Sequence, residues 1–465
     1  MARAKNLVGA ALLILGLVSL DSAEPADAAP AGAGRPAATG KALYTPQLLR
    51  NQEWLGNRQG TFSDHQIDVI ARNVGYLTIS KNEGDSSLSS QFEDARRIVA
   101  AAKAYGNPIK VFAYSGATYF FTNNFPHGGS PGWGSYLKTF KTDWYMKDAA
   151  GNPIKLYGGR DKDQALAYML DLSNADYRNW AVATLLDWMK QAPFAGVSFD
   201  NAVVLDGTHD SPRVTGGGSW NDLLCGKGAP VDAAGNCARM AAWNSGLVAF
   251  MAKIREAMSA RGKEVMYNGI APGRAHGADR NLHLLPVVGG ATDESFCYNA
   301  GKGGGEGATL TPMLNDIQLM QREAAAGHKL FMFTNHRHNA HKESLASYCL
   351  GGFLMGWQPG YNYFVYHAYY TDNLSNGYPE IAEQNLNLGL PTAQYAQHGT
   401  VLTRSFQNGF VAVNIGNSPG SFVLPSDLVE FRNGAKAGAF TKGSSATVSP
   451  QSGRFFLSAA FVNGR

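Results

Sequence analysis

Eight short apolar runs separated by amphipathic stretches limit the folds open to this chain more than any other feature. Stretches between the runs, such as "NADYRNWAVATLLDWMKQA", place apolar residues at the i, i+3, i+4 and i+7 spacing of a helix. Strands that alternate with helices indicate a parallel sheet. A count of eight favours a (β/α)8 barrel, although a doubly wound sheet would show the same alternation. The runs cover residues 74–80, 109–115, 167–173, 195–201, 263–269, 290–299, 328–335 and 353–364.

The residue pattern changes from strand–helix alternation to short strands after about residue 394. Short alternating runs separated by Asn-Gly, Gly-Asn and Pro-Gly turns follow, as in "VLTRSFQNGFVAVNIGNSPGSFVL". We therefore predict an α/β chain, with a (β/α)8 TIM barrel over residues 44–393 and a small C-terminal antiparallel, β-sandwich-like domain over residues 394–465. We expect this second domain to support the barrel rather than to bind carbohydrate.

The N-terminus has the three parts of a secretory signal. "MARAK" is positively charged, "LVGAALLILGLVSL" is apolar, and Ala26–Ala28 offers a small-residue cleavage site. We predict a signal peptide over residues 1–28, a flexible spacer over residues 29–43, and a secreted or periplasmic protein. An uncleaved membrane anchor is the alternative, but the apolar segment is short for a membrane span.

The cysteine content agrees with export. There are four cysteines, and Cys225 and Cys237 lie in one Gly/Asn-rich stretch, which predicts a local disulfide. Cys297 and Cys349 can pair only if the fold brings them together. A zinc site is the rival interpretation, but no Cys-x-x-Cys spacing supports it.

Composition argues against a nucleic-acid partner. The chain is 45% hydrophobic and 16% charged, with a formal net charge of only +4 and no long basic stripe. We expect a well-buried globular monomer that needs no cofactor.

Carboxylates recur where the predicted strands end. The run "AGVSF" leads directly into Asp200, "TDES" places Asp293 and Glu294 at the end of the sixth run, and "LDLSN" places Asp171 at the end of the third. Each could instead be a helix cap or a loop brace. In a barrel, however, the carboxyl ends of the strands form the mouth in which enzymes of this fold place their catalytic groups.

Two carboxylates that face each other across a barrel mouth are the requirement for glycoside hydrolysis. One protonates the leaving oxygen, and the other attacks the anomeric carbon or activates water. We assign these roles to Asp200 and Glu294, with Asp293 the alternative to Glu294, because strand register decides which neighbour points inward. A Glu beside Phe296 and Tyr298 could have the raised pKa that a general acid needs.

Aromatic side chains near the strand ends suggest platforms for sugar rings, although core packing is the plainer interpretation of most of them. Trp144 lies in a long insertion, and the others lie at or after strand ends. The expected substrate contacts around the strand ends are Tyr114, Trp144, Tyr267, Asn268, Asp293, His336, Trp357 and Tyr363.

Three other motifs carry weaker signals. "NHRHNAH" places His336, His338 and His341 at the seventh run, which could hold a metal or touch sugar hydroxyls. No carboxylate nearby completes a ligand set, so we predict no metal. "GGSPG" at residues 128–132 matches the esterase nucleophile motif without the strand and helix that motif needs. Residues 299–307 are a glycine-rich loop, either a lid over the cleft or a plain solvent loop.

Three blocks resemble a known family. "LDLSNADYRNWAVATLLDWMKQAPFAGVSFDN" is similar to the central block of secreted (β/α)8 proteins of glycoside hydrolase-like family 15. The "DESF" run resembles the Glu-bearing sixth strand of that group, and "VLTRSFQNGFVAVNIG" resembles the start of its small β-domain. The resemblance implies Asp200 as nucleophile or base and Glu294 as acid, with Asp171, Asn201 and Asn335 as substrate contacts.

The sequence therefore predicts a secreted glycoside hydrolase that acts on a polysaccharide, such as an exopolysaccharide. Long insertions after two strands favour an extended groove and endo cleavage. The alternatives are a non-catalytic carbohydrate-binding barrel and a metal-dependent esterase or deacetylase that uses the histidines.

Overall fold

Eight parallel strands close into a barrel in the order β1-β11-β10-β9-β8-β7-β3-β2, which confirms the predicted (β/α)8 class. The computed structural model describes residues 51–55, 61–79, 88–121, 139–157, 165–205, 219–270, 278–294, 296–297, 310–334, 343–366 and 382–464. The barrel strands are β1 (Asn51–Leu55), β2 (Val74–Ile79), β3 (Lys110–Gly116), β7 (Gly196–Asp200), β8 (Glu264–Ile270), β9 (Gly290–Asp293), β10 (Lys329–Thr334) and β11 (Asn362–Tyr366).

Two of the predicted strands are placed differently. Residues 167–173 lie outside the barrel, because β6 (Ala165–Met169) pairs antiparallel with β4 (Tyr119–Phe121) and β5 (Lys155–Tyr157) in a separate sheet. Strand β1, which precedes the first predicted run, fills the eighth place. Most of 353–364 belongs to the end of helix α8 or to the turn after it, and only its last residues enter β11. Asp200 nevertheless ends the fourth barrel strand, since one strand is lost and one is gained before it.

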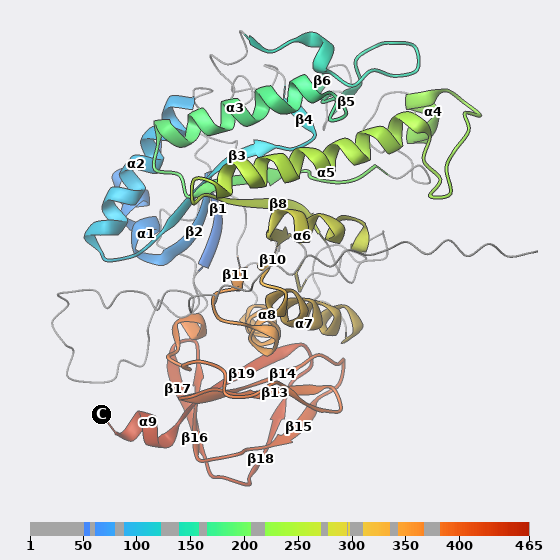
Figure 1. The fold of residues 1–465 in the computed structure, drawn as a ribbon. Helices are drawn as coiled ribbons and strands as arrows, with labels where there is room; N and C mark the ends of the chain where they lie inside the picture. The colour runs from blue at the N-terminus through green and yellow to red at the C-terminus, as the bar shows by residue number, and fades with distance from the viewer. Residues whose placement is uncertain are drawn as a thin grey trace, which may run out of the picture. The chain divides into compact units, whose positions relative to one another are not determined.

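Helices connect the strands, as the apolar periodicity predicts. Asn174 caps helix α3, because its side chain accepts hydrogen bonds from the backbone N–H groups of Asp176 (2.9 Å) and Tyr177 (3.2 Å). Helices α3 and α5 run side by side (Figure 1). No helix in the described ranges is long and apolar enough to cross a membrane. The helices are α1 (Asp64–Asn73), α2 (Leu88–Ala104), α3 (Ala175–Gln191), α4 (Trp220–Cys225), α5 (Ala238–Ser259), α6 (Leu285–Val288), α7 (Leu310–Ala325) and α8 (Glu343–Gly356), with short 3-10 turns η2 (Thr142–Trp144), η3 (Ala278–Leu284) and η5 (Ala382–Asn385).

The two faces of the barrel strands pack in separate cores. The outward side chains, such as Val197 and Met332, belong to the main core together with the helices. The inward side chains form a cluster of their own, composed of Tyr76, Phe112, Met266, Phe331 and Tyr363. Because neighbouring residues of a strand face opposite sides, these residues identify which positions point into the barrel.

Inward side chains stack in levels, each built by alternate strands. Phe112, Met266 and Phe331, from β3, β8 and β10, form one level. The register shows the rule: Phe112 pairs with Gly196, Gly196 pairs with Glu264, and Met266 lies two residues beyond Glu264. A residue on one strand and its level partner on the second strand along are therefore offset by two residues from the direct pairing. The same rule assigns the other inward residues of the paired strands to their levels.

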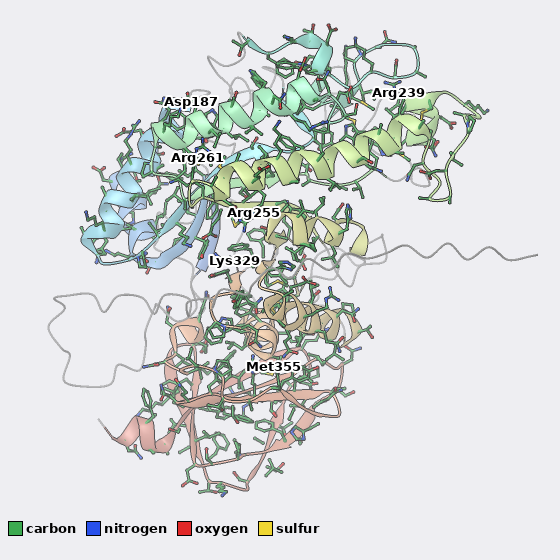
Figure 2. The ribbon with its side chains drawn as sticks, in the orientation of Figure 1. Asp187, Arg239, Arg255, Arg261, Lys329 and Met355 are labelled. Carbon is green, nitrogen blue, oxygen red and sulfur yellow. A yellow bond between two sulfur atoms is a disulfide. The ribbon has the colours of Figure 1, made fainter. Side chains whose placement is uncertain are left out.

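Charged side chains close the lowest of these levels. Lys110, Glu264 and Lys329 meet there, with Lys329 Nζ donating to a Glu264 carboxylate oxygen at 2.8 Å and Lys110 paired to the other oxygen. Lys329 is labelled in Figure 2. The two ammonium groups lie 5.5 and 5.8 Å from the centre of the Tyr76 ring. Burial raises the pKa of Glu264, but both lysines outweigh it and hold that pKa below its usual value. Burial lowers the pKa of Lys329 more than Glu264 raises it.

Glu264→Gln is expected to reduce the free energy of unfolding by about 1–3 kcal/mol at neutral pH, because two lysines then face each other without an anion. The folded pKa of Glu264 is depressed, so its contribution is complete above the unfolded value near 4.5 and is lost as pH falls below it. Urea unfolding at pH 7 and near pH 3 measures both effects. Glu256→Gln, at an exposed position of α5, is the control. A deficit in Glu264→Gln that persists undiminished at low pH would contradict this account.

An antiparallel β-region follows the barrel, as predicted. One sheet has the order β12-β13-β14-β19-β16-β17, a second pairs β15 with β18, and Phe410, Phe422 and Phe456 pack in the core that they share. The elements are β12 (Ala396–His398), β13 (Val401–Ser405), β14 (Gly409–Asn414), β15 (Gly420–Val423), β16 (Leu428–Arg432), β17 (Ala435–Phe440), β18 (Ser445–Val448), β19 (Ser452–Ser458) and α9 (Ala459–Asn463).

A buried arginine connects this sheet to the barrel. Arg404 of β13 is 3% exposed, and its Nη1 donates to the carbonyl oxygens of Leu354 (2.8 Å), Met355 (3.0 Å) and Trp357 (2.8 Å) at the end of α8. Its Nε donates to the carbonyl oxygen of Ala393 at 2.9 Å. The guanidinium thus satisfies carbonyls that a helix end leaves unpaired. Burial lowers the pKa of Arg404 to about 10, so the group stays charged at neutral pH.

Candidate active site

Asp200 ends strand β7 with its carboxylate turned into the barrel and only 7% exposed. Its Oδ2 accepts a hydrogen bond from the Tyr114 hydroxyl at 2.6 Å. Its Oδ1 accepts from Asn268 Nδ2 at 3.0 Å and from the backbone N–H of Asn201 at 2.8 Å. Tyr114 and Asn268 come from β3 and β8, the strands on either side of β7. Donors from both sides hold the carboxylate in one orientation and complement a negative charge.

The backbone turns sharply directly after this carboxylate. Asn201 has φ = +56°, in the left-handed region that non-glycine residues rarely adopt. Thr118 Oγ1 donates to the Asn201 carbonyl oxygen at 2.9 Å, and the Ala202 N–H donates to the Asn268 carbonyl oxygen at 3.1 Å. These contacts hold Asn201 in its unusual conformation. Sequence reasoning missed Thr118, which follows β3 by two residues and carries no motif that identifies it.

Strand register separates the two adjacent acids of β9. Asp293 is fully buried and pairs with Ile270 and Met332, which both belong to the outer core. Thr292 pairs with the inward residues Asn268 and Phe331. Alternation therefore places Asp293 toward the helices, on the face opposite to Thr292. Glu294 is half-buried in the turn directly after β9.

Asp200 and Glu294 both lie at the carboxyl ends of barrel strands. The Asp200 carboxylate contacts Asn268, Asn268 pairs with Thr292 of β9, and Glu294 follows two residues later, in the turn after that strand. Strands β7 and β9 are separated only by β8, so their carboxyl ends bring both acids to the mouth. Two carboxylates at this place can act as an acid and a nucleophile or base.

Two predicted contacts serve local structure. The Asp171 carboxylate accepts from the Ser173 backbone N–H (3.0 Å) and hydroxyl (2.5 Å), which forms the turn before α3. Because 167–173 is not a barrel strand, Asp171 does not end one. Trp144 is buried in an aromatic cluster, 5.4 Å from Trp180 and 6.1 Å from Tyr177 between ring centres. Neither residue is carried into the proposed site.

Three predicted aromatic contacts lie away from the mouth. Tyr267 faces the outer core, and its hydroxyl donates to the Asn281 carbonyl oxygen at 2.7 Å, with burial raising its pKa. Trp357 is buried against Phe406 of the C-terminal region. Tyr363 points inward, but near the start of β11, where its hydroxyl lies 3.1 Å from that of Tyr76. Their places reflect ordinary packing.

The remaining predictions fall outside the described residues. These are Asn335 and the three histidines His336, His338 and His341, the glycine-rich loop 299–307, the 128–132 motif, the signal peptide over 1–28 and the spacer over 29–43.

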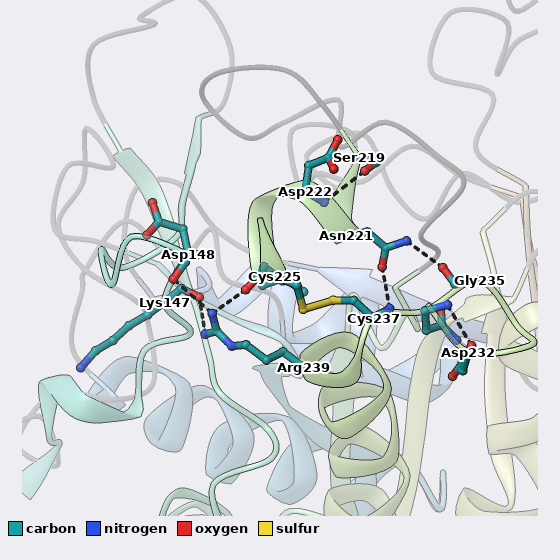
Figure 3. The surroundings of a disulfide bond; sticks show 12 residues. Lys147, Asp148, Ser219, Asn221, Asp222, Cys225, Asp232, Gly235, Cys237 and Arg239 are labelled. Carbon is teal, nitrogen blue, oxygen red and sulfur yellow. Dashed lines mark hydrogen bonds between the residues drawn. A yellow bond between two sulfur atoms is a disulfide. The ribbon is translucent and has the colours of Figure 1, made fainter. Parts of the chain in front are cut away.

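A disulfide braces the insertion that follows β7. Cys225 and Cys237 are bonded, with an S–S distance of 2.10 Å, which confirms the predicted local bridge (Figure 3). Beside it, Arg239 donates to the carbonyl oxygens of Lys147 (2.6 Å), Asp148 (3.1 Å) and Leu224 (2.6 Å). Lys147 and Asp148 belong to the insertion after β3. This arginine therefore joins the two insertions.

Each of the two insertions contains the same five-residue turn. Residues 148–152 and 232–236 are both Asp-Ala-Ala-Gly-Asn. In each, the aspartate Oδ1 accepts from backbone N–H groups two and four residues ahead, and the glycine has positive φ, +88° and +78°. The repeat of both sequence and bonding shows that this turn is set locally.

The second disulfide joins the region after β9 to α8. Cys297 and Cys349 are bonded, with an S–S distance of 2.14 Å, so the fold does bring this pair together. Because Cys297 lies three residues after Glu294, the bond fixes the chain close to the predicted acid.

Comparison with known proteins agrees with the barrel fold. A family described as "Hypothetical glycosyl hydrolase family 15" matches residues 103–410. The structure of a noncanonic maltogenic α-amylase from Thermotoga neapolitana aligns with a TM-score of 0.50 at 9% identity, over 89% of this chain and 100% of its own. An α-amylase from Malbranchea cinnamomea aligns with a TM-score of 0.48 at 10% identity, over 90% and 99%. At such identities the likeness shows the fold alone. No curated protein sequence matches the chain.

Proposed function

The chain belongs to hypothetical glycosyl hydrolase family 15, and on that premise we propose that it is a glycoside hydrolase that cleaves a polysaccharide with Asp200 and Glu294. The observation that carries the proposal is the place of these two carboxylates: Asp200 ends β7, and Glu294 directly follows β9, the second strand along the barrel. Asp200 is held there by three hydrogen-bond donors. A single ordered carboxylate would serve binding, whereas two acids at one mouth suit acid and nucleophile roles.

The proposed chemistry assigns one task to each acid. Glu294 gives its proton to the glycosidic oxygen as the bond to the anomeric carbon breaks. Asp200 acts on the opposite side of the sugar, either by attacking the anomeric carbon or by taking a proton from the attacking water. Tyr114 and Asn268 keep the Asp200 carboxylate oriented in both cases, since they donate to its two different oxygens. Positioned donors of this kind lower the barrier without having to reorganise during the reaction.

The surroundings of the mouth support a polymeric substrate. The chain between β3 and α3, and that between β7 and α5, emerge on the carboxyl side of the strands, where barrel enzymes bind substrate. Arg239 joins these two insertions to each other. Two long, connected insertions beside the mouth suit the binding and internal cleavage of a polymer rather than the removal of end groups. Two disulfides agree with a secreted or periplasmic protein.

Glu294→Gln is expected to lower kcat by about 10²–10⁴-fold, because the variant has no proton to donate. Asp293→Asn, on the outer face, should keep kcat within a few-fold of the wild type and lose stability instead. Release of reducing ends from a panel of bacterial and plant polysaccharides measures both variants. An inactive Asp293→Asn beside an active Glu294→Gln would move the acid by one residue. Binding without release from any polymer would favour a non-catalytic carbohydrate-binding barrel.

A further inference from the structure

Three buried hydroxyl groups point into the barrel beneath the carboxylates. Thr78, Ser198 and Thr292, from β2, β7 and β9, are 0%, 0% and 1% exposed. Among the described residues, none of their three side-chain oxygens has a hydrogen-bond partner. Buried hydroxyls almost always have a partner, in the protein or in ordered water. Three orphans within one barrel therefore need an explanation.

The register places all three hydroxyls on one level. Thr78 pairs with Phe112, Phe112 pairs with Gly196, and Ser198 lies two residues beyond Gly196. Ser198 pairs with Met266 of β8, and Met266 lies opposite Gly290 of β9, because the next residues, Tyr267 and Ala291, pair with each other. The residue two positions beyond Gly290 is Thr292, which therefore lies on the same level as Ser198. This hydroxyl level lies directly above the Phe112 level. It lies below Asp200, which follows Ser198 by two residues on β7.

The hydroxyl level is unusually polar for the inside of a barrel. Barrel interiors are normally filled by bulky branched residues, four to a level. Here serine and threonine occupy three of the four strands that build the level. Each hydroxyl offers one donor and two acceptor sites, and no charged side chain shares the level, so its ligand should be neutral and able both to donate and to accept. We infer that this level binds ordered water molecules inside the barrel.

Aromatic rings pack beneath the hydroxyl level on its amino-terminal side. The Tyr76 ring lies 6.0 Å from Phe112 and 5.3 Å from Phe331, and Phe331 stacks on Tyr363 at 4.9 Å. Tyr114 and Asn268 lie on the other side, between the hydroxyls and the mouth. The inference rests on the buried hydroxyls alone and holds whether or not the chain is a hydrolase.

The experiment pairs a crystal structure with threonine-to-valine exchange, which replaces a hydroxyl by a methyl group of the same shape. The crystal structure of the full chain is expected to show water within hydrogen-bonding distance of at least two of the three hydroxyls. Thr78→Val and Thr292→Val should each lower Tm by about 1–3 °C, because the bound water loses a partner. Thr403→Val, a buried strand position on β13, gives the background of the same exchange.

Two results would overturn the inference. One is a hydroxyl level with no water density. The other is an unchanged or higher Tm in both valine variants relative to Thr403→Val, since removing an orphan hydroxyl from a dry core stabilises a protein. If the valine variants fold too poorly for comparison, magnetic relaxation dispersion of water on the wild type and on Ser198→Ala decides. A loss of long-lived internal water in Ser198→Ala supports the site, and an equal signal from both proteins contradicts it.

Discussion

Asp200→Asn is expected to lower kcat by at least about 10²–10⁴-fold on any polysaccharide that the wild type cleaves. The exchange removes the negative charge that either attacks the anomeric carbon or takes the proton from water. It also puts an NH₂ group where one carboxylate oxygen accepted from Tyr114 or from Asn201 and Asn268. Two donors then face each other, so a modest loss of stability should accompany the loss of activity. Initial rates of reducing-end release, together with a thermal melt, measure both effects.

Asp176→Asn is the matched control, because it makes the same chemical change at an exposed position in the first turn of α3. Its rate should equal that of the wild type. Activity retained in Asp200→Asn would remove this carboxylate from the mechanism. Activity lost equally in both variants would point to a general effect of the exchange and not to the site.

Arg404→Met is expected to reduce the free energy of unfolding by about 3–5 kcal/mol. The methionine fills part of the space but donates no hydrogen bond, so the carbonyls of Ala393, Leu354, Met355 and Trp357 lose their shared partner in a buried place. Urea unfolding followed by tryptophan fluorescence measures the change. The barrel and the C-terminal sheet should lose stability together, since the contact joins them.

Arg432→Met provides the comparison within the same sheet. Its side chain is 66% exposed, and the buried Glu430 with which it pairs keeps two hydrogen bonds from Arg454, so its removal should cost less than about 1 kcal/mol. Equal unfolding midpoints for the two variants would show that burial of Arg404 contributes nothing. A loss confined to the sheet, with an unchanged barrel transition, would show that Arg404 does not couple them.

The sequence predicts the barrel well because strand and helix periods differ strongly along most of the chain. It fails where a run is short. "AYMLDLS" is apolar enough for a barrel strand, yet β6 pairs in a sheet of its own, while the more polar "NQEWL" of β1 takes its place. Pairing partners, not local composition, decide between such segments.

The candidate site follows the same pattern. Position at a strand end is readable from the sequence, and it identifies Asp200, Tyr114 and Asn268, which the structure brings together. The side of the strand to which a residue points cannot be read from the sequence, because a shift of one residue in the register reverses it. Tyr267 and Asn268 are neighbours, yet only Asn268 points inward. The sequence predicts Trp144 in a long insertion and Trp357 at a strand end, but both are buried, because large rings pack against partners such as Trp180 and Phe406.

The closure of the barrel by β1 has a consequence for how the chain is made. Strand β1 pairs with β2, which soon follows it, and also with β11, the last strand of the barrel to leave the ribosome. Until β11 arrives, the sheet has an open edge on each side, and open edges invite pairing with other chains. The barrel can complete its hydrogen bonding only after all of its other strands have been made. Folding should therefore be slow and sensitive to protein concentration, and a holdase that shields these edges should raise the yield of native protein.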